Sequence, residues 1–259
     1  MIIWTGTLKM LLSTMYHHIN CDQFSNDLES FEQHLNYVVD RFHIVVPGDT
    51  LSKKRDNLCL TFDDAYYDFY YYVFPLLKKY QIKAILAVPT ALISDITDVT
   101  PDLRLSLDHK EIYREKNYRK YGSFCTWDEL REMNDSGFVV MASHSHTHKG
   151  LTSENINLQE EIVTSKKILE EKMQTEIESF ILPFGRYDYD SFTLLQRHYR
   201  YIFKVGQGVN RDFNGVRGLI YRIDGDELKD DRSIFSFRSI LGYRIKSLAK
   251  TLHDGILDR

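Results

Sequence analysis

Cysteine, proline and tryptophan are scarce in this chain, and neither sign of charge dominates it. Its 259 residues contain three cysteines, five prolines and two tryptophans. An odd number of widely spaced cysteines without a CxxC pair excludes a disulfide-rich secreted framework and predicts free thiols. The formal net charge is −4, with 33 Lys and Arg against 37 Asp and Glu. Such a balance gives no overall attraction to phosphate backbones, so we expect no nucleic acid partner.

Long apolar runs are absent as well. No stretch reaches the roughly 18 uninterrupted apolar residues that a membrane-spanning helix needs. Residues 1–20 lack a basic start and a small-residue cleavage site, so we interpret them as part of the fold rather than as a signal peptide. These absences favour the cytoplasm, or the cytoplasmic side of a membrane, as the location of the protein. Secretion of a longer precursor stays open as the alternative.

The composition is that of a globular protein, with 43% hydrophobic and 27% charged residues, and the length fits one domain over residues 1–259. Short apolar runs alternate with helical patterns along almost the whole chain, which is typical of a parallel α/β fold. Seven runs are strand candidates, and this number favours a barrel over a small sandwich. They are Leu11–His17, Asn57–Phe62, Lys83–Val88, Phe138–Ala142, Ser179–Leu182, Tyr201–Val205 and Leu219–Ile223.

Three amphipathic helices are expected between these strands. Apolar residues recur at helical spacing from Leu28 to Phe42. Thr126 and Glu129 have the spacing of a capping box, and Asn157 is the expected N-cap of a third helix. The charged segment 95–124 fits neither a strand nor a clean helix. We expect it to form an extended loop over one end of the barrel, either functional or a mobile surface excursion.

Two polar clusters follow predicted strands, TFDD at residues 61–64 and HSHTH at residues 144–148. The carboxyl ends of parallel strands are where barrels and open α/β sheets hold their active sites. Two histidines four residues apart offer neutral imidazoles to one divalent ion, and one carboxylate completes a ligand set with open positions. The remaining carboxylate is then free to act as a base. Together the clusters predict metal-assisted hydrolysis.

The LTFDD segment, the SHSHTH segment and PFG at residues 183–185 resemble the first three motifs of the polysaccharide deacetylase family, carbohydrate esterase family four. Segments 15–19, 74–84 and 126–130 resemble further family segments in the same order, so the resemblance covers most of residues 11–223. It implies a distorted (β/α)7 barrel. It also implies a metal-dependent hydrolase that cleaves a linear amide C–N bond, removing N-acetyl or, less often, O-acetyl groups from a sugar or cell-surface polysaccharide.

The resemblance also implies roles for individual residues. Asp64, His144 and His148 would hold the metal, which we expect to be zinc or another divalent transition metal such as cobalt, nickel or iron. Asp63 would be the general base that activates a metal-bound water. Ala65 follows the aspartate pair where family members commonly have glycine, and we expect the backbone to accommodate it.

Substrate-binding residues are expected on three further segments. The resemblance implies that Pro183 and Phe184 line the substrate groove, with the Phe184 backbone N–H helping to stabilise an oxyanion. Family members often carry an arginine two residues before this proline that positions the base, and this chain has Ile181 there. Arg222 in the YRI segment is the candidate to replace it, and we group it with the substrate-binding residues. Tyr66 is a candidate for sugar contact, with core packing as its alternative role.

The general acid is the least defined part of the expected site. Many family members use a histidine in a late Leu-x-His motif, and this chain has no convincing equivalent. His17 and His18 are the catalytic candidates, each with a buried structural role as the alternative. His146 or a metal-bound species could also protonate the leaving amine. A general acid typically contributes ~10²–10⁴ in rate.

Residues 232–253 carry five basic and no acidic side chains interleaved with apolar ones. This pattern predicts a basic amphipathic helix that either closes the barrel or makes peripheral contact with an anionic membrane. Membrane contact would favour a lipid-linked sugar as the substrate. Two other functions stay open: hydrolysis of a non-sugar amide or cyclic imide on the same barrel, and glycan binding without turnover.

Overall fold

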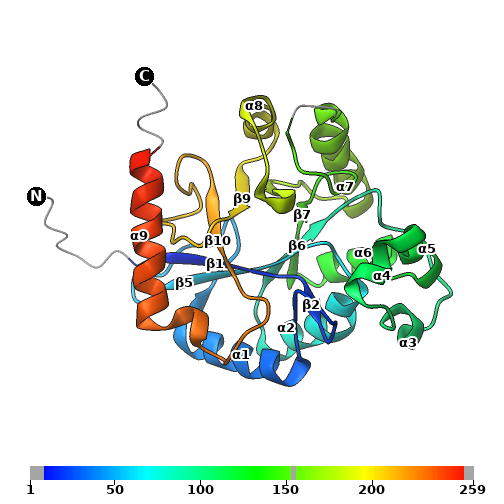
Figure 1. Ribbon diagram of the computed structural model, residues 1–259, viewed down its shortest axis with the longest axis horizontal. Coiled ribbons are helices and arrows are strands. Elements are labelled where there is room, and N and C mark those ends of the chain that lie inside the picture. The colour runs from blue at the N-terminus through cyan, green and yellow to red at the C-terminus, as the bar shows by residue number, and fades with distance from the viewer. Residues whose placement is uncertain (1–8, 153–155, 254–259) are drawn as a thin grey trace, which may run out of the picture.

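Seven parallel strands form a closed barrel in the computed structural model, which describes residues 9–152 and 156–253 (Figure 1). The order around the barrel is β1-β10-β9-β8-β7-β6-β5, and β5 pairs back to β1 from Leu11↔Asn57 to Tyr16↔Phe62. The expected α/β barrel is therefore confirmed, and all seven strand candidates are strands. Their bounds are β1 Leu11–Tyr16, β5 Asn57–Phe62, β6 Ala84–Val88, β7 Val139–Ser143, β8 Ser179–Ile181, β9 Tyr201–Val205 and β10 Ile220–Asp224.

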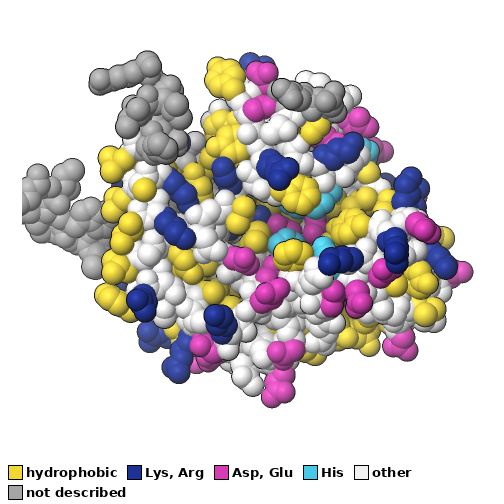
Figure 2. Space-filling model, in the orientation of Figure 1, with side chains coloured by type: hydrophobic (Ala, Val, Ile, Leu, Met, Phe, Trp, Pro, Cys, Tyr) yellow, Lys and Arg dark blue, Asp and Glu magenta, His cyan; other side chains and the backbone are white. Residues whose placement is uncertain are grey.

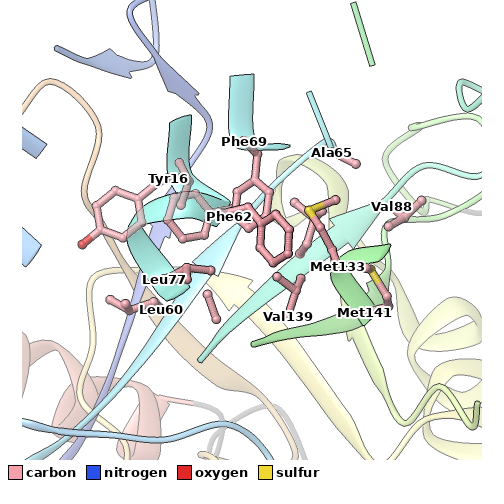
Figure 3. Close-up of a cluster of buried hydrophobic side chains, with 14 of the residues drawn as sticks. Tyr16, Leu60, Phe62, Ala65, Phe69, Leu77, Val88, Met133, Val139 and Met141 are labelled. Carbon is pink, nitrogen blue, oxygen red and sulfur yellow. The ribbon is translucent and has the colours of Figure 1, made fainter. Parts of the chain in front are cut away.

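The strands alternate between two buried faces, because successive side chains of a strand point in opposite directions. One face fills the barrel, with Leu11, Cys59 and Ile220 in a single apolar cluster. The other face packs under the surrounding helices in a second, larger cluster (Figure 3) that includes Leu60 and Phe62. This alternation decides which residues just beyond the strand ends can reach the centre of the barrel.

Helices cover the outside of the barrel (Figure 1). The expected capping box of Thr126 and Glu129 is confirmed at the start of α6. The Asn157 side chain accepts the backbone N–H of Glu160, as a capping residue does, ahead of a π-helical segment. The covering elements are α1 Leu28–Arg41, π-helical Phe69–Val73, α2 Phe74–Tyr80, α6 Trp127–Asp135, π-helical Gln159–Thr164, α7 Ser165–Met173 and α8 Tyr189–His198.

Three two-residue strands complete the sheets. β2, His18–Ile19, pairs with β3, Ser25–Asn26, and β4, His43–Ile44, adds to the edge of β5. The pairing of β2 with β3 follows directly after β1, so it fixes where the chain runs as it leaves the barrel.

Segment 95–124 is not the extended loop that we expected. It contains three short helices, α3 Pro101–Arg104, α4 His109–Tyr113 and α5 Asn117–Tyr121, with a 3₁₀ turn at Arg114–Lys116. A helix of four or five residues is too short to display a 3.6-residue apolar period in the sequence. The segment is held to the barrel by the buried Arg104, whose guanidinium binds Glu129 at 2.5 and 2.9 Å.

A 3₁₀ turn at Ser233–Phe235 leads into α9, Phe237–His253, which lies beside the amino end of β1 (Figure 1, red). Ile240 and Tyr243 pack against the outer core, and the Ser247 hydroxyl bonds both backbone groups of Val209. Over residues 9–152 and 156–253, no helix is both long and apolar enough to cross a membrane. The three cysteines are all described and are free thiols.

Candidate active site

A pocket of about 660 Å³ opens at the carboxyl ends of the strands. Histidine and acidic side chains gather in a hollow at the centre of this face (Figure 2). The segment with the three short helices also contributes to its wall. Seven of the predicted site residues line it: His17, Asp63, Asp64, His144, His148, Phe184 and Arg222.

The two adjacent aspartates both reach this pocket, although neighbouring residues on a strand point apart. Asp63 continues the barrel-facing series of Cys59 and Thr61. Asp64 has a φ of 73° and Ala65 a φ of 55°, so the chain turns sharply through the left-handed region at the end of β5. This turn brings the Asp64 side chain into the pocket beside Asp63. Ala65 is thus accommodated, but in a conformation that favours glycine.

Asp63 is held by a buried arginine. Arg222 on β10 donates to both carboxylate oxygens of Asp63, at 2.6 and 2.9 Å, and also to the Thr61 hydroxyl at 3.0 Å. Burial disfavours the charged carboxylate, but the charge and hydrogen bonds of Arg222, with the charges of His144 and His17, together outweigh it and hold the pKa of Asp63 below its ordinary value. Asp63 is therefore an oriented carboxylate that can accept a proton.

This pairing fits the expected replacement of the base-positioning arginine by Arg222, but not a direct substrate-binding role for it. The Arg222 side chain is 1% exposed, and its guanidinium donates to Asp63 and Thr61. It therefore does not offer a bidentate hydrogen bond to a substrate. The structure places it where the arginine missing at Ile181 would be expected to act, on the carboxylate of Asp63. Its effect on a substrate would be exerted through Asp63.

Asp64, His144 and His148 converge on one point. One ligand atom from each lies within 4.8 Å of the others. The Nε2 atoms of His144 and His148 lie 3.4 and 3.0 Å from Asp64 Oδ1. His144 Nδ1 lies 2.8 Å from the Ile181 carbonyl oxygen and donates to it, which leaves Nε2 free for coordination.

This set fits a divalent transition metal. Asp64 Oδ1 is buried and has no well-aligned hydrogen-bond donor among the described residues. Burial alone would raise the pKa of Asp64, but His148 and His144 outweigh it and the pKa lies well below its ordinary value. A buried, ionised oxygen facing two imidazole nitrogens is the donor set that zinc and similar ions prefer.

The backbone around the three ligands is held in conformations that are uncommon outside glycine. Ser145 and His148 have φ values of 64° and 58°. The carboxylate of the buried Glu161 accepts the backbone N–H groups of His146 and Thr147, at 2.9 and 2.8 Å. Strained backbone persists only where its surroundings fix it, and it clusters at functional sites. Glu161 is one such fixing contact, supplied by the helix that follows.

His17 lies directly beyond β1 and faces the pocket. Its Nδ1 lies 2.5 Å from Asp226 Oδ2, and its backbone N–H donates to Asp226 Oδ1 at 3.0 Å. Its Nε2 lies 3.9 Å from Asp63 Oδ2. Burial disfavours the charged ring, but the hydrogen bond and charge of Asp226, with the charges of Asp63 and Asp64, raise the pKa of His17 to about 9.

Three predicted site residues do not reach the pocket. His18 has the opposite strand parity to His17, is 2% exposed, and lies behind the site with its Nδ1 2.7 Å from Asp68 Oδ2. Tyr66 is fully packed, with its ring stacked 3.8 Å from that of His18. Pro183 is buried, so of the PFG segment it is Phe184, with a φ of 55°, that projects at the rim.

Two residues that the sequence analysis did not single out belong to the site. Asp226 follows Asp224 and Gly225, and a carboxylate just beyond a predicted strand is the signal that could have revealed it. Gly225 is required there, because a Cβ would lie 2.3 Å from the Tyr16 ring. His109, on α4, lines the pocket and bonds His18 Nε2 through its Nδ1, at 3.2 Å. No signal in the sequence pointed to it.

Residues 51–201 match the model of the family described as polysaccharide deacetylase. The chain belongs to the polysaccharide deacetylase family. It is 26% identical over 208 residues to YxkH of Bacillus subtilis, whose name places it among polysaccharide deacetylases, covering 75% of this chain and 64% of YxkH. It is 33% identical over 105 residues to the poly-beta-1,6-N-acetyl-D-glucosamine N-deacetylase of Escherichia coli K12, covering 40% of this chain and 14% of that enzyme. The chain thus spans less than two thirds of the length of these curated relatives.

Solved structures of deacetylases share the fold. The Streptococcus pyogenes deacetylase PplD, in complex with acetate, superposes with a TM-score of 0.69 at 21% identity, over 88% of this chain and 97% of PplD. A de-N-acetylase from Aggregatibacter actinomycetemcomitans gives 0.67 at 19% identity, over 91% of this chain and all of that one. At these identities the likeness shows the fold, which is the (β/α)7 barrel.

Proposed function

We propose that this protein is a metal-dependent hydrolase that removes N-acetyl groups from a sugar polymer. The observation that carries the proposal is the convergence, in one pocket, of three groups with separate tasks. These are the ligand set of Asp64, His144 and His148, the Asp63–Arg222 pair, and the His17–Asp226 pair. Each of the three has the chemistry that amide hydrolysis needs at a different moment.

The ligand set would hold zinc or another divalent transition metal. When bound there, such an ion would supply a Lewis acid that lowers the pKa of a water molecule and stabilises negative charge developing on the amide oxygen. The buried Asp64 Oδ1 supports this assignment, because it has no well-aligned hydrogen-bond donor among the described residues and faces two imidazole nitrogens.

Asp63 would accept the proton of the attacking water. Its lowered pKa keeps it ionised, and the two Arg222 hydrogen bonds fix its orientation. Both carboxylate oxygens lie in the pocket end of the barrel, where bulk water has little access. A base that is ionised and held in one rotamer needs no rearrangement before it takes the proton.

His17 would return a proton to the leaving amine. The Asp226 carboxylate accepts from Nδ1 and so directs the Nε2 proton towards the pocket. With a pKa raised to about 9, the ring is protonated at neutral pH and can act as an acid. The acid and the base thus face the same cavity from β1 and β5, which are paired strands.

An N-acetylglucosamine polymer is the substrate class that we propose. The pocket volume falls within the ordinary range for small-ligand sites. The exposed ring of Phe184 at its rim offers an apolar surface of the kind on which sugars stack. The name of the E. coli relative supports a polymer of this sugar.

Acetate release by metal-reconstituted protein tests the proposal, with β-1,6-linked N-acetylglucosamine oligomers among the substrates and metal content measured on the same samples. Asp63→Asn should keep the metal and lower turnover by about 10²- to 10⁴-fold. His144→Ala should lose both. The matched control His198→Ala, outside the pocket, should lose neither. Stoichiometric metal without acetate release from any acetylated sugar would overturn the activity, and absence of bound metal would overturn the ligand set.

A further inference from the structure

Helix α9 carries an unusual outer surface. Five large apolar side chains on it, between 47% and 85% exposed, follow one another at intervals of four, four, three and four residues: Phe237, Leu241, Ile245, Leu248 and Leu252. At 3.6 residues per turn, these positions fall within roughly 80° of arc on one face of the helix. We call this face the α9 stripe. It forms a continuous apolar edge of the molecule, yellow at the left of Figure 2.

The stripe points outwards because the opposite face of α9 is fixed to the barrel. Ser247 bonds Val209 on that face, and Ile240 and Tyr243 contact the outer core. Lys250 also turns inwards, where it donates to the Gly206 carbonyl and lies over the Tyr221 ring. Rotating the helix to bury the stripe would break these contacts, so its exposure is a property of the docked helix.

The charges on the helix indicate what the stripe contacts. α9 has no acidic residue. Arg238 and Arg244 are exposed at the two edges of the stripe, and Lys246 is exposed further round the helix. An apolar face bordered by cations is the arrangement of helices that lie in the plane of an anionic bilayer, where the apolar side chains enter the acyl region and the arginines meet lipid phosphates.

We propose that α9 docks this protein on an anionic lipid surface, with the α9 stripe inserted at the boundary between the headgroups and the acyl chains. A second copy of the chain is a poorer occupant. A symmetric contact between two stripes would place the arginines of both copies along one interface, and no acidic residue of α9 could compensate them. In Figure 2 the stripe lies at the edge of the molecule and the catalytic pocket near its centre, so docking leaves the pocket mouth uncovered.

Co-sedimentation of the full-length chain with vesicles tests this inference without measuring turnover, so its outcome is independent of the proposed activity. The vesicles contain phosphatidylcholine alone or with a quarter of phosphatidylserine, at low and at high salt. Binding is expected to the anionic vesicles and to weaken with salt. Leu248→Ser should weaken it about tenfold or more, since a buried leucine is lost. Arg238→Gln and Arg244→Gln should each weaken it about fivefold.

Ile96→Ser is the matched control, because Ile96 is 78% exposed but lies far from α9 in the sequence and outside the stripe. It should bind as the unaltered chain does. Absence of binding to anionic vesicles would overturn the proposal, as would equal binding to both vesicle types or equal loss with Ile96→Ser. A lipid-free dimer in sedimentation velocity that Leu248→Ser dissociates would show a second copy on the stripe and would also overturn it.

Discussion

His17 and His18 are neighbours in the chain, yet they belong to two different regions of the molecule. His17 faces the pocket, and His18 lies behind it in what we call the rear cluster, formed by His18, Asp68, Tyr66 and His109. Each histidine has a carboxylate on its Nδ1, at 2.5 Å for Asp226 and 2.7 Å for Asp68. Their side chains are 19% and 2% exposed.

This comparison shows that a histidine–carboxylate pair does not by itself identify a catalytic acid. The pairs resemble each other in distance and atom type, and what separates them is access to the substrate. That access follows from strand alternation, because His17 continues the barrel-facing series of β1 and His18 the helix-facing one. The His18–Asp68 pair, which we call the rear pair, is instead buried behind the pocket.

The largest expected effect comes from replacing the imidazole rings of His17 and His18 in turn. His17→Asn should lower kcat by about 10²- to 10⁴-fold, the usual contribution of a general acid. His18→Asn should change kcat less than tenfold. It should instead lower the free energy of unfolding by about 1–3 kcal/mol, because Asp68 loses one of its two buried donors and keeps only the Ile19 backbone N–H. Steady-state acetate release and urea unfolding of both variants measure the two effects. Equal loss of kcat in the two variants would contradict the distinction.

The next effect is on the pH dependence of stability, and it concerns only the His17–Asp226 pair in the pocket. In metal-free protein the pKa of His17 is raised to about 9, above the ordinary value of about 6.5. A folded-state pKa above the unfolded value means that the protonation of His17 stabilises the fold fully below pH ~6.5, and that this contribution is lost as the pH rises through 9. Asp226→Asn should lower the pKa of His17 and remove most of this slope.

NMR titration of His17 and unfolding measured from pH 6 to 10 would check this prediction. Asp68→Asn is the matched control, since it removes the carboxylate of the rear pair and leaves Asp226 in place. The titration of His17 should be unchanged in it. A His17 pKa near 6.5 in the unaltered protein would contradict the charge pairing on which the proposed acid depends.

A smaller effect is expected where the two regions meet, at His109. If Asp68 accepts from His18 Nδ1, then His18 Nε2 accepts from His109 Nδ1, and His109 Nε2 is left as an acceptor. Burial lowers the pKa of His109, which favours its neutral ring. A neutral acceptor in the pocket wall suits a sugar hydroxyl.

His109→Phe keeps a ring at this position and removes the acceptor. It should raise KM about 3- to 10-fold, the value of one hydrogen bond, with kcat within a few-fold. Nitrogen chemical shifts of His109 would report the tautomer directly. Loss of kcat with unchanged KM would contradict a binding role for His109.

The sequence predicts features that depend on neighbouring residues. It does not predict contacts between distant residues that form only when the barrel closes. The seven strands and the His144 to His148 spacing are visible as short patterns. The Asp63–Arg222 and His17–Asp226 contacts join residues 159 and 209 positions apart, and only the pairing of β1 with both β5 and β10 brings them together. Arg222 could be singled out by the resemblance, but not its bidentate contact.

The smallest effect concerns Ala65, in the turn that brings Asp64 into the pocket. Its φ of 55° costs about 1–2 kcal/mol in a residue with a Cβ. Ala65→Gly would relieve this strain, but it would lose a buried methyl, worth about 0.8 kcal/mol, and add unfolded-state entropy of about 0.4–1 kcal/mol. These terms nearly cancel, so thermal unfolding should change by less than about 1 kcal/mol.

Ala87→Gly is the matched control, because it has the same losses as Ala65→Gly without the relief of backbone strain. Ala87 is equally buried but lies in the regular strand β6, so no strain is relieved and the same two losses should destabilise the fold by about 1–2 kcal/mol. If both substitutions destabilise the protein equally, the turn at Ala65 is not strained. The methyl group would then be tolerated for its packing alone, and the geometry that brings both carboxylates into the pocket would not require a glycine-like backbone.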